Sequence, residues 1–492
     1  DGKRLEVKLP LAWLPGYEKK GLYVTGGIGG RWVPAGGRPV NFIPAPFALR
    51  AVPSDVPEQF ALKISALGLG GGIVVTSDSD DNVREELRSF RWPHSIISRC
   101  RPRISAVGRE LNVAAKDTAG NEYRLTLFRY EPARPMLTLY RDLVERRKAD
   151  PAQLEKFAKA NLADRDVLRE IARAKRELFL TDEGFEPLRK LLFSKRHPFR
   201  PSHNYSVQFD SAWRPGGNVS QIEMPFEKGR LLPEKGIVTE LVSAGKDGVI
   251  RDPAPDFDGE KVYYSLRENF KEYYRIHELN LRTGTTRRIS PEGPFHDFWP
   301  TPLPDGGLAM ISTRIKKKFI CWRPQAAVLF RMERDGSDAK PLSFANLTEF
   351  APSVMEDGRL LWTRSEYNDK GADYGHMLWT IRADGTYPEL AFGNTLALPQ
   401  GFANGRQMPV TREWCGVMIS HFGDLNGPVA LMDPTKSPHD PSAVRSITPE
   451  IPWPGYPGYS ETFREPYPVT RDAILIAWAP QDRFGLFLID RY

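Results

Sequence analysis

The sequence predicts a mainly β protein. We expect a β-sandwich-like or jelly-roll-like domain over residues 1–145, a helical linker over 146–195 and a β-propeller of six or seven blades over 196–492. Three observations favour this organisation. The chain has 492 residues, which is too long for one ordinary domain. Its 41 glycines and 43 prolines punctuate many short apolar runs. A turn motif also recurs through the last three-fifths of the chain.

The first range alternates short β-type runs with Gly and Pro, as in the segments FALKISALGLGGGIVVTS and NEYRLTLFRYEP. β-branched and aromatic residues between turn signals are typical of strands. The glycine-rich segments GGIGGRW and GLGGG do not fit a phosphate-binding loop, because the required glycine spacing and the following helix are missing. We therefore predict strands joined by tight turns, and no nucleotide site, in this range.

The second range is rich in Ala, Leu, Glu, Lys and Arg. Asp150 followed by Pro151 is a typical helix start. Val167, Ile171, Ala174 and Leu178 then recur at helical spacing, which predicts one apolar helix face. A further short helical segment is expected from residue 181, in the sequence TDEGFEPLRKLLF.

The third range contains an internal repeat. The segments FDGEKVYYS (257–265), PDGGLAMIS (304–312) and EDGRLLWTR (356–364) each place an Asp-Gly turn before a β-run. A second series of turns at Gly284, Gly336 and Gly385 lies between them. Both series have a period of about 50 residues, which is typical of four-stranded propeller blades. Two later segments, PVTREWCGVMIS (409–420) and PVTRDAILIAWA (468–479), keep the strand but replace Asp-Gly by Thr-Arg.

This repeat resembles the TolB/WD40-like propellers of bacterial envelope proteins. A closer resemblance is to haem-free relatives of the hydrazine synthase alpha subunit, of the type common in planctomycetes. The segments that carry it are LLFSKRHPFRPSHNY, FHDFWPTPLPDGG, DGRLLWTRSEYNDKG, LWTIRADGTYPELAFGN and HFGDLNGPVALMDP, in this order over about 300 residues. The resemblance does not cover residues 1–145, and it does not extend clearly into the helical range.

The resemblance implies a propeller and export from the cytoplasm, so we expect a periplasmic or extracellular location. The first residue is Asp rather than Met, which a removed secretion signal would explain. No CxxCH motif occurs, so no haem is attached covalently through that motif within this sequence. Family members often carry a cysteine near the position of Tyr205, and this chain does not. We therefore expect no hydrazine chemistry by this chain alone.

Charge and hydropathy restrict the kinds of partner that we expect for this protein. The net charge is +7, from 69 Lys and Arg against 62 Asp and Glu, and no long basic block occurs. We therefore expect no nucleic-acid partner. No stretch approaches the roughly 18 apolar residues of a membrane helix, so no membrane span is predicted. The expected partners are a polysaccharide or a protein subunit.

Candidate site residues lie beside the repeat motifs. Four of the 8 histidines are among them. The predicted catalytic group comprises His203, Tyr205, His421 and Arg364. The predicted ligand-binding group comprises His296, Asp297, Glu366, Tyr367, His376 and Asp424. Structural roles compete with these assignments, because a histidine often only satisfies a buried hydrogen bond and a carboxylate often only pairs with a nearby arginine.

Two chemistries would use such a set. In β-elimination on an acidic polysaccharide, His or Tyr removes the proton next to a carboxylate that Arg or a metal neutralises. Hydrolysis would instead need two carboxylates, such as Glu366 with Asp424 or Asp297. No cofactor is encoded by a motif, although histidines from different blades leave room for a divalent metal.

The sequence therefore predicts, first, an extracytoplasmic binding or scaffold protein that holds a ligand, for example a carbohydrate, or a partner subunit at the propeller face. The main alternative is a secreted carbohydrate-active enzyme, a polysaccharide lyase before a glycoside hydrolase. A further alternative is a subunit of a redox assembly whose haems sit on other chains. Whether the chain is an enzyme is left open.

Overall fold

The computed structural model divides the chain into two compact units. The first comprises residues 1–180 with 448–452 and 492, and the second comprises 181–447 with 453–491. The structure describes residues 133–162, 164–201, 203–204, 213–318, 325–366, 375–393, 401–421, 424–448, 462–480 and 483–491. Before residue 133 it describes only the backbone of eight strands.

The first unit begins with strands. β5 (Phe47–Val52), β8 (Glu122–Arg129), β7 (Glu110–Lys116) and β6 (Arg103–Val107) form one antiparallel sheet in this order. Two short pairs accompany it: β1 (Leu22–Val24) with β4 (Val40–Phe42), and β2 (Gly26–Ile28) with β3 (Arg31–Val33). The sequence predicted strands here, but whether they form a sandwich stays a prediction.

Three helices follow, and the first begins earlier than predicted. α3 (Ala133–Arg147) occupies the end of the range assigned to the β domain, and α4 (Ala152–Ala158) and α5 (Arg165–Phe179) come after it. The Asp150 carboxylate accepts a hydrogen bond from the Ala152 amide, as expected at a helix start. On α5, Ile171 is fully buried, and Val167, Ala174 and Leu178 pack against the same apolar cluster. The predicted apolar face of this helix is confirmed.

The segment after residue 181 differs from its prediction. A 3₁₀ helix (Glu183–Arg189) starts at Asp182, whose carboxylate accepts from the Gly184 amide. The following KLLFSK sequence is a strand, β9 (Lys190–Lys195), instead of a continuing helix. It pairs antiparallel with β10 (Asn218–Glu223), and this distant partner decides its conformation. β13 (Ile237–Ser243) completes this three-stranded sheet, and β11 (Phe226–Glu227) pairs with β12 (Arg230–Leu231) in between.

The next sheets are four-stranded and antiparallel. β14 (Val249–Pro255), β15 (Lys261–Arg267), β16 (Arg275–Asn280) and β17 (Thr286–Arg288) form one. β18 (Asp297–Pro302), β19 (Leu308–Ser312), β20 (Val328–Met332) and β21 (Lys340–Pro341) form the next, called here the β18 sheet.

The β22 sheet has eight strands in two halves. The first half contains β22 (Glu349–Val354), β23 (Leu360–Ser365), β24 (His376–Ile381) and β25 (Glu389–Phe392). The second contains β26 (Gly401–Gln407), β27 (Trp414–Ile419), β28 (Val429–Met432) and β29 (Val444–Ser446). A single parallel pair, His376 with Gly401, joins the halves. β30 (Phe463–Pro468), β31 (Ala473–Trp478) and β32 (Gly485–Asp490) form the last sheet.

The predicted turns are confirmed. Gly259, Gly306 and Gly358 of the first series have φ of 69°, 95° and 82°. Gly284, Gly336 and Gly385 of the second series likewise have φ of 71°, 90° and 88°. This left-handed backbone region favours glycine, because it has no Cβ atom to clash. In the two Thr-Arg turns, the hydroxyls of Thr411 and Thr470 accept amide hydrogen bonds from Glu413 and Asp472 instead.

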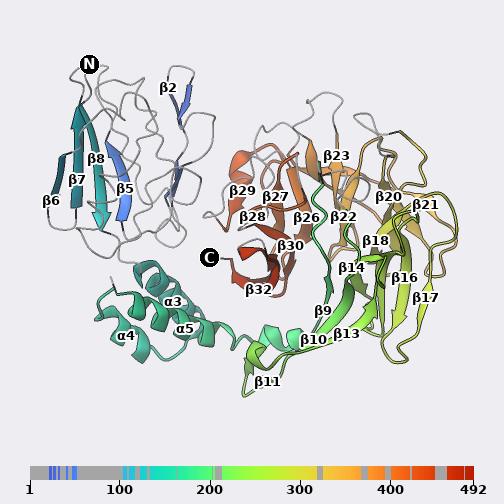
Figure 1. Ribbon diagram of the computed structural model, residues 1–492, viewed down its shortest axis with the longest axis horizontal. Helices are drawn as coiled ribbons and strands as arrows, with labels where there is room; N and C mark the ends of the chain where they lie inside the picture. The colour runs from blue at the N-terminus through green and yellow to red at the C-terminus, as the bar shows by residue number, and fades with distance from the viewer. Residues whose placement is uncertain are drawn as a thin grey trace. The chain divides into compact units, whose positions relative to one another are not determined.

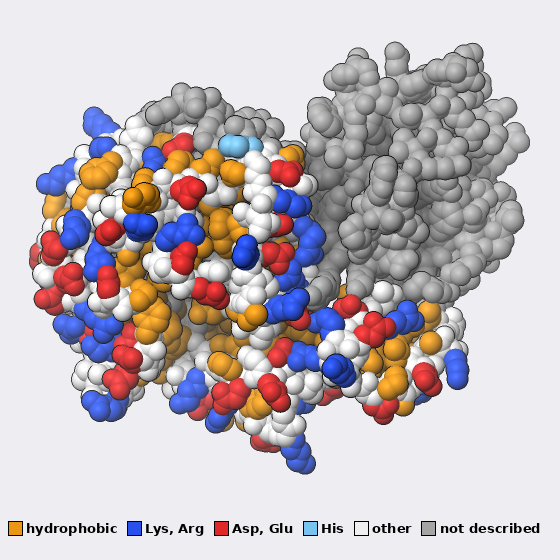
Figure 2. Space-filling model, turned by 180° about the vertical axis from the view of Figure 1, so that it is seen from behind, with side chains coloured by type: hydrophobic (Ala, Val, Ile, Leu, Met, Phe, Trp, Pro, Cys, Tyr) orange, Lys and Arg blue, Asp and Glu red, His pale blue; other side chains and the backbone are white. Residues whose placement is uncertain are grey.

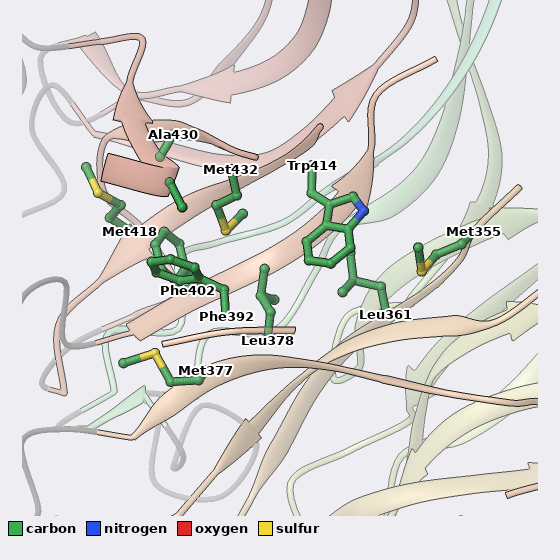
Figure 3. Close-up of a cluster of buried hydrophobic side chains, with 11 residues drawn as sticks. Met355, Leu361, Met377, Leu378, Phe392, Phe402, Trp414, Met418, Ala430 and Met432 are labelled. Atoms are coloured by element: carbon green, nitrogen blue, oxygen red, sulfur yellow. The ribbon is translucent and has the colours of Figure 1, made fainter. Parts of the chain in front are cut away.

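The first strands of successive sheets lie together. β14 contacts β9 and β18, β22 contacts β18 and β26, and β26 contacts β30. Figure 1 shows these strands in the middle of the second unit, with β17, β21 and β29 at its periphery. An apolar core fills the space between sheet halves; its members include Leu361, Leu378, Phe402 and Trp414 (Figure 3).

Each of these first strands from β14 onward carries the same irregularity. A β-bulge interrupts its pairing with the second strand, and a non-glycine residue in the bulge has a positive φ. Neighbouring bulges are linked, because the Thr301 hydroxyl donates to Pro352 O at 3.0 Å and the Ser353 hydroxyl donates to Gly405 O at 2.7 Å. The five bulge residues are Asp252, Trp299, Ala351, Asn404 and Glu465.

Candidate functional site

The candidate residues gather at one end of their sheets. Asp297 starts β18 opposite Ser312 at the end of β19, and Ser365 at the end of β23 pairs with His376 at the start of β24. His421 follows the end of β27. The Asp-Gly turns join the opposite ends of the same strands. The antiparallel order of the strands therefore places residues that are far apart in sequence along one edge.

Three of the predicted histidines come together at this end. His376 Nε2 lies 3.1 Å from His421 Nδ1, and their rings stack at an interplanar angle of 23°. The His203 ring meets His421 edge-on, with centroids 5.3 Å apart. His376 and His421 are buried, whereas His203 is partly exposed. His203 is thus the member that a ligand would meet first.

Backbone contacts hold the His203 segment in place. The Asn204 amide donates to His421 O at 3.1 Å, and the Asn204 side chain donates to Ser420 O at 3.0 Å. A segment just after β9 is therefore fixed to the end of β27, more than two hundred residues later. No motif in the sequence indicates this contact, and Asn204 is not among the predicted site residues.

The histidines form a hydrogen-bonded chain with a serine. Ser365 Oγ lies 2.7 Å from His376 Nδ1, and the other ring nitrogen of His376 contacts His421. Burial, and to a smaller extent the adjacent His421, lowers the pKa of His376 to about 3. The ring is therefore neutral at physiological pH, with one donor and one acceptor nitrogen, so its two hydrogen bonds run in one direction.

Asp424 belongs to the same end but is already paired. It is buried, and its Oδ2 accepts from the Arg464 guanidinium of β30. Its Oδ1 accepts from the Leu425 amide at 2.8 Å. Asp424 therefore fixes the loop after His421 to the last sheet.

His296 and Asp297 lie on the β18 sheet and have structural partners. His296 Nδ1 accepts from the Tyr274 amide at 3.1 Å, and burial together with Arg267 and Arg275 lowers its pKa to about 3. Asp297 is fully buried. It accepts from Ser312 at 2.7 Å and from Arg314 at 2.6 and 3.0 Å.

Arg364 and Glu366 pair with each other. Arg364 Nε lies 3.0 Å from Glu366 Oε1, and both side chains are about one-quarter exposed, at 25%. The Arg364 guanidinium also lies 4.8 Å from the centre of the Trp379 ring. The pairing of Arg364 with Glu366 is the structural role that competes with a ligand-binding role for these residues. Tyr205 and Tyr367 lie outside the described residues.

Metal binding at this end stays a prediction. Within the described ranges, no group of three or more His, Cys, Asp or Glu side chains is arranged to hold a metal ion. The histidines instead bond to one another and to Ser365.

Two arginines that the sequence analysis missed share a local pattern. Arg251 begins Arg-Asp-Pro-Ala-Pro in β14, and Arg464 begins Arg-Glu-Pro-Tyr-Pro in β30. Both side chains are almost fully buried, at 2% and 7% exposure. The shared sequence, an arginine before an acidic bulge residue and a proline, was a signal that could have identified them.

The comparisons with known proteins give similarities to solved structures only. No protein-family model matches the chain, and no curated protein matches it. Hydrazine synthase of Kuenenia stuttgartiensis is 14% identical, with a TM-score of 0.46, over 61% of this chain and 43% of that one. TolB of Acinetobacter baumannii is 12% identical, with a TM-score of 0.42, over 80% of this chain and 76% of that one.

A structure described as oligogalacturonate lyase in complex with manganese is also similar. It is 13% identical, with a TM-score of 0.36, over 61% of this chain and 90% of that one. At these values the similarities assign neither an activity nor site residues to this chain. The narrower expectation, a relative of the hydrazine synthase alpha subunit, stays a prediction.

Proposed function

We propose that residues 181–491 form a closed β-propeller that binds a ligand at the end carrying His203, His376 and His421. The consecutive contacts between the first strands support a ring. The ends of this array also approach each other, because a Cβ atom on Gly184, just before β9, would lie 2.6 Å from Thr470 in the last sheet. Six sheet units of this kind would make a six-bladed propeller.

The observation that carries the binding function is the convergence of the three histidines. Segments around residues 203, 376 and 421 meet through direct contacts between their rings. Such a cluster of adjacent titratable groups, with one partly exposed member, is typical of ligand-binding sites. A rigid ring of sheets would hold these groups in a fixed arrangement.

The proposed location is outside the cytoplasm. It rests on the resemblance of the repeats to envelope propellers. Within the ranges that the structure describes, we find no helix that is both long and apolar enough to cross a membrane. Figure 2 shows basic and acidic side chains interspersed over the visible described surface, which is in keeping with a partner other than nucleic acid.

The test is a binding titration with matched histidine variants. Soluble oligosaccharides, both neutral and uronate-containing, are titrated against the wild-type protein, His203→Gln and the control His439→Gln. His439 lies on an exposed turn after β28. We expect His203→Gln to weaken binding about tenfold and the control to leave it unchanged. Equal affinities in both variants, or no binding to any oligosaccharide, would contradict the proposal.

A second candidate function is polysaccharide β-elimination. The hydrogen-bonded chain from Ser365 through His376 to His421 favours it, because such a chain can move a proton away from a base. The matching assay follows the ultraviolet absorbance of unsaturated uronates with uronate-containing glycans. We expect product from the wild-type protein and at least a hundredfold less from His421→Gln. No absorbance change with any of these glycans would remove this candidate.

A further inference from the structure

Three arginines from distant parts of the chain lie close together in the second unit. Arg196 follows β9, Arg251 lies in β14 and Arg464 lies in β30. The ring of Phe199 is shared by the first two guanidinium groups, at 3.8 Å from Arg196 and 5.0 Å from Arg251. Arg464 is close enough to act on Arg196 electrostatically. The cluster therefore concentrates positive charge around one aromatic ring.

The carboxylates nearby do not pair with all three. Asp252 lies 2.7 Å from Arg251, and Asp424 pairs with Arg464, which also has Glu465 at 3.8 Å. Among the residues that the structure describes, no carboxylate lies within 4 Å of the Arg196 guanidinium. Its hydrogen bond goes to a backbone oxygen, His197 O, at 3.1 Å. Arg196 is thus the cation of this cluster without an ionic partner in the described chain.

Arg251 has unused hydrogen-bonding capacity. Its Nε donates to Asp252, but its Nη1 is buried and has no hydrogen-bond partner within the described part of the chain. The guanidinium lies 4.5 Å from the centre of the Trp299 ring, which stabilises its charge but accepts no conventional hydrogen bond. A buried donor left without an acceptor is unfavourable, and a bound anion or water molecule would satisfy it.

The charge of Arg196 and its exposure to solvent both favour an anion as the missing partner. Partial burial of Arg196, and to a smaller extent the charges of Arg464 and Arg251, lowers its pKa to about 10, so the group remains a cation at neutral pH and is repelled by both. Arg196 is partly exposed and the Glu465 side chain is 49% exposed, whereas Arg251 is buried. Solvent therefore reaches the cluster from the side of Arg196 and Glu465.

We propose that Arg196 and Arg251, with Arg464 beside them, bind an oxyanion group, a carboxylate or a phosphate, of the ligand. This inference rests on the proposed ligand-binding function and adds that the ligand is acidic. Guanidinium groups present paired N–H donors that match the oxygens of these anions. The Asp424–Arg464 pair connects this cluster to the loop after His421, so the histidines and the arginines belong to one continuous region.

The experiment compares anions with a neutral sugar on charge-matched variants. Inorganic phosphate, galacturonate oligomers and neutral galactose oligomers are titrated by calorimetry against the wild-type protein, Arg196→Gln, Glu465→Gln and the control Arg282→Gln. Arg282 lies on the exposed turn between β16 and β17. Its replacement by Gln removes one positive charge, as Arg196→Gln does, but far from the cluster's aromatic ring. The unfolding temperature of each variant is measured first, and removal of Arg196 should not lower it, because repulsion is relieved.

We expect at least one anion to bind, to bind about tenfold more weakly to Arg196→Gln, and to bind more tightly to Glu465→Gln, where a competing carboxylate is gone. Arg282→Gln should match the wild type. The phosphate and uronate arms show which oxyanion is preferred, and binding of either supports the inference.

Binding of the neutral oligomers alone, through His203, would overturn the oxyanion site but keep the proposed function. Binding of none would overturn both. Equal losses in Arg196→Gln and Arg282→Gln would reduce the effect to net charge and also overturn the site.

Discussion

Two histidines, one on the β18 sheet and one on the β22 sheet, lie at the same end of their sheets but on different strands, and they have different partners. His296 accepts a hydrogen bond from a backbone amide, and Asp297 beside it is enclosed by Ser312 and Arg314. His376 instead bonds to two side chains, one of which is His421. The first arrangement connects strands, whereas the second leaves titratable groups in contact with each other. The end of the sheet is therefore shared by both histidines, and their hydrogen-bond partners are what distinguish them.

The largest effect on stability is expected from removal of the buried carboxylate beside His296. Asp297→Ala removes a fully buried carboxylate and leaves Arg314 without its partner. Loss of one member of a buried ion pair costs about 3–5 kcal/mol, so we expect a decrease of this size in the free energy of unfolding in urea. Asp338→Ala, which removes an exposed pair with Lys340, is the control and should cost less than about 1 kcal/mol. A small effect at Asp297 would mean that its pairing is not structural.

Acid should destabilise both ends through their neutral histidines. Each of His296 and His376 has a pKa lowered to about 3 from the usual 6.5, so the unfolded chain binds protons that the folded chain does not between these values. Stability is then complete above pH 6.5 and falls as the pH is lowered, by about 2 kcal/mol per histidine from pH 7 to pH 5. Urea unfolding at several pH values measures this slope.

Single variants sharpen that measurement. His296→Gln and His376→Gln should each reduce the pH slope by close to one proton relative to the wild-type protein. An unchanged slope in either variant would show that the histidine is protonated in the folded protein.

A smaller effect is expected where the two halves of the β22 sheet meet. A Cβ atom on Gly401 would lie 2.6 Å from His376 Cβ, so Gly401→Ala must displace the histidine. We expect a loss of about 1–3 kcal/mol and a shifted imidazole resonance for His376 in NMR spectra. Gly284→Ala, in an open turn with φ of 71°, should cost about 1 kcal/mol but leave that resonance in place. Identical spectra for both variants would place the close contact in doubt.

The smallest effect concerns the ion pair of Arg364 and Glu366. Because both groups are partly exposed, Glu366→Gln should change the free energy of unfolding by less than about 1 kcal/mol. If Glu366 also binds a ligand, the same variant would reduce affinity in the oligosaccharide titration. A loss of stability well above 1 kcal/mol would instead make the pair a structural element like Asp297 and Arg314.

The features that the sequence predicted well are local ones. The turn glycines were identified because a positive φ strongly restricts the residue type, and the face of α5 because helical spacing is regular. The strand β9 was predicted as helix, because its KLLFSK sequence suits either state and only pairing with β10 decides.

The candidate site could be predicted only in part, because local motifs identify single residues but not the contacts between them. His203, His376 and His421 stood out beside the repeat motifs, but their mutual contacts depend on how sheets far apart in sequence meet. The arginine cluster was missed because a buried arginine has no distinctive spacing. Only the shared pattern around Arg251 and Arg464 indicated it.

The repeated bulge separates backbone shape from side-chain chemistry. At equivalent places the chain carries an aspartate, a tryptophan, an alanine, an asparagine and a glutamate, yet the same left-handed bend is kept at all of them. The left-handed bend therefore follows the position in the sheet and does not require one type of side chain. Substitutions at these five positions should therefore change the side chains that the first strands carry while the course of the strands is kept.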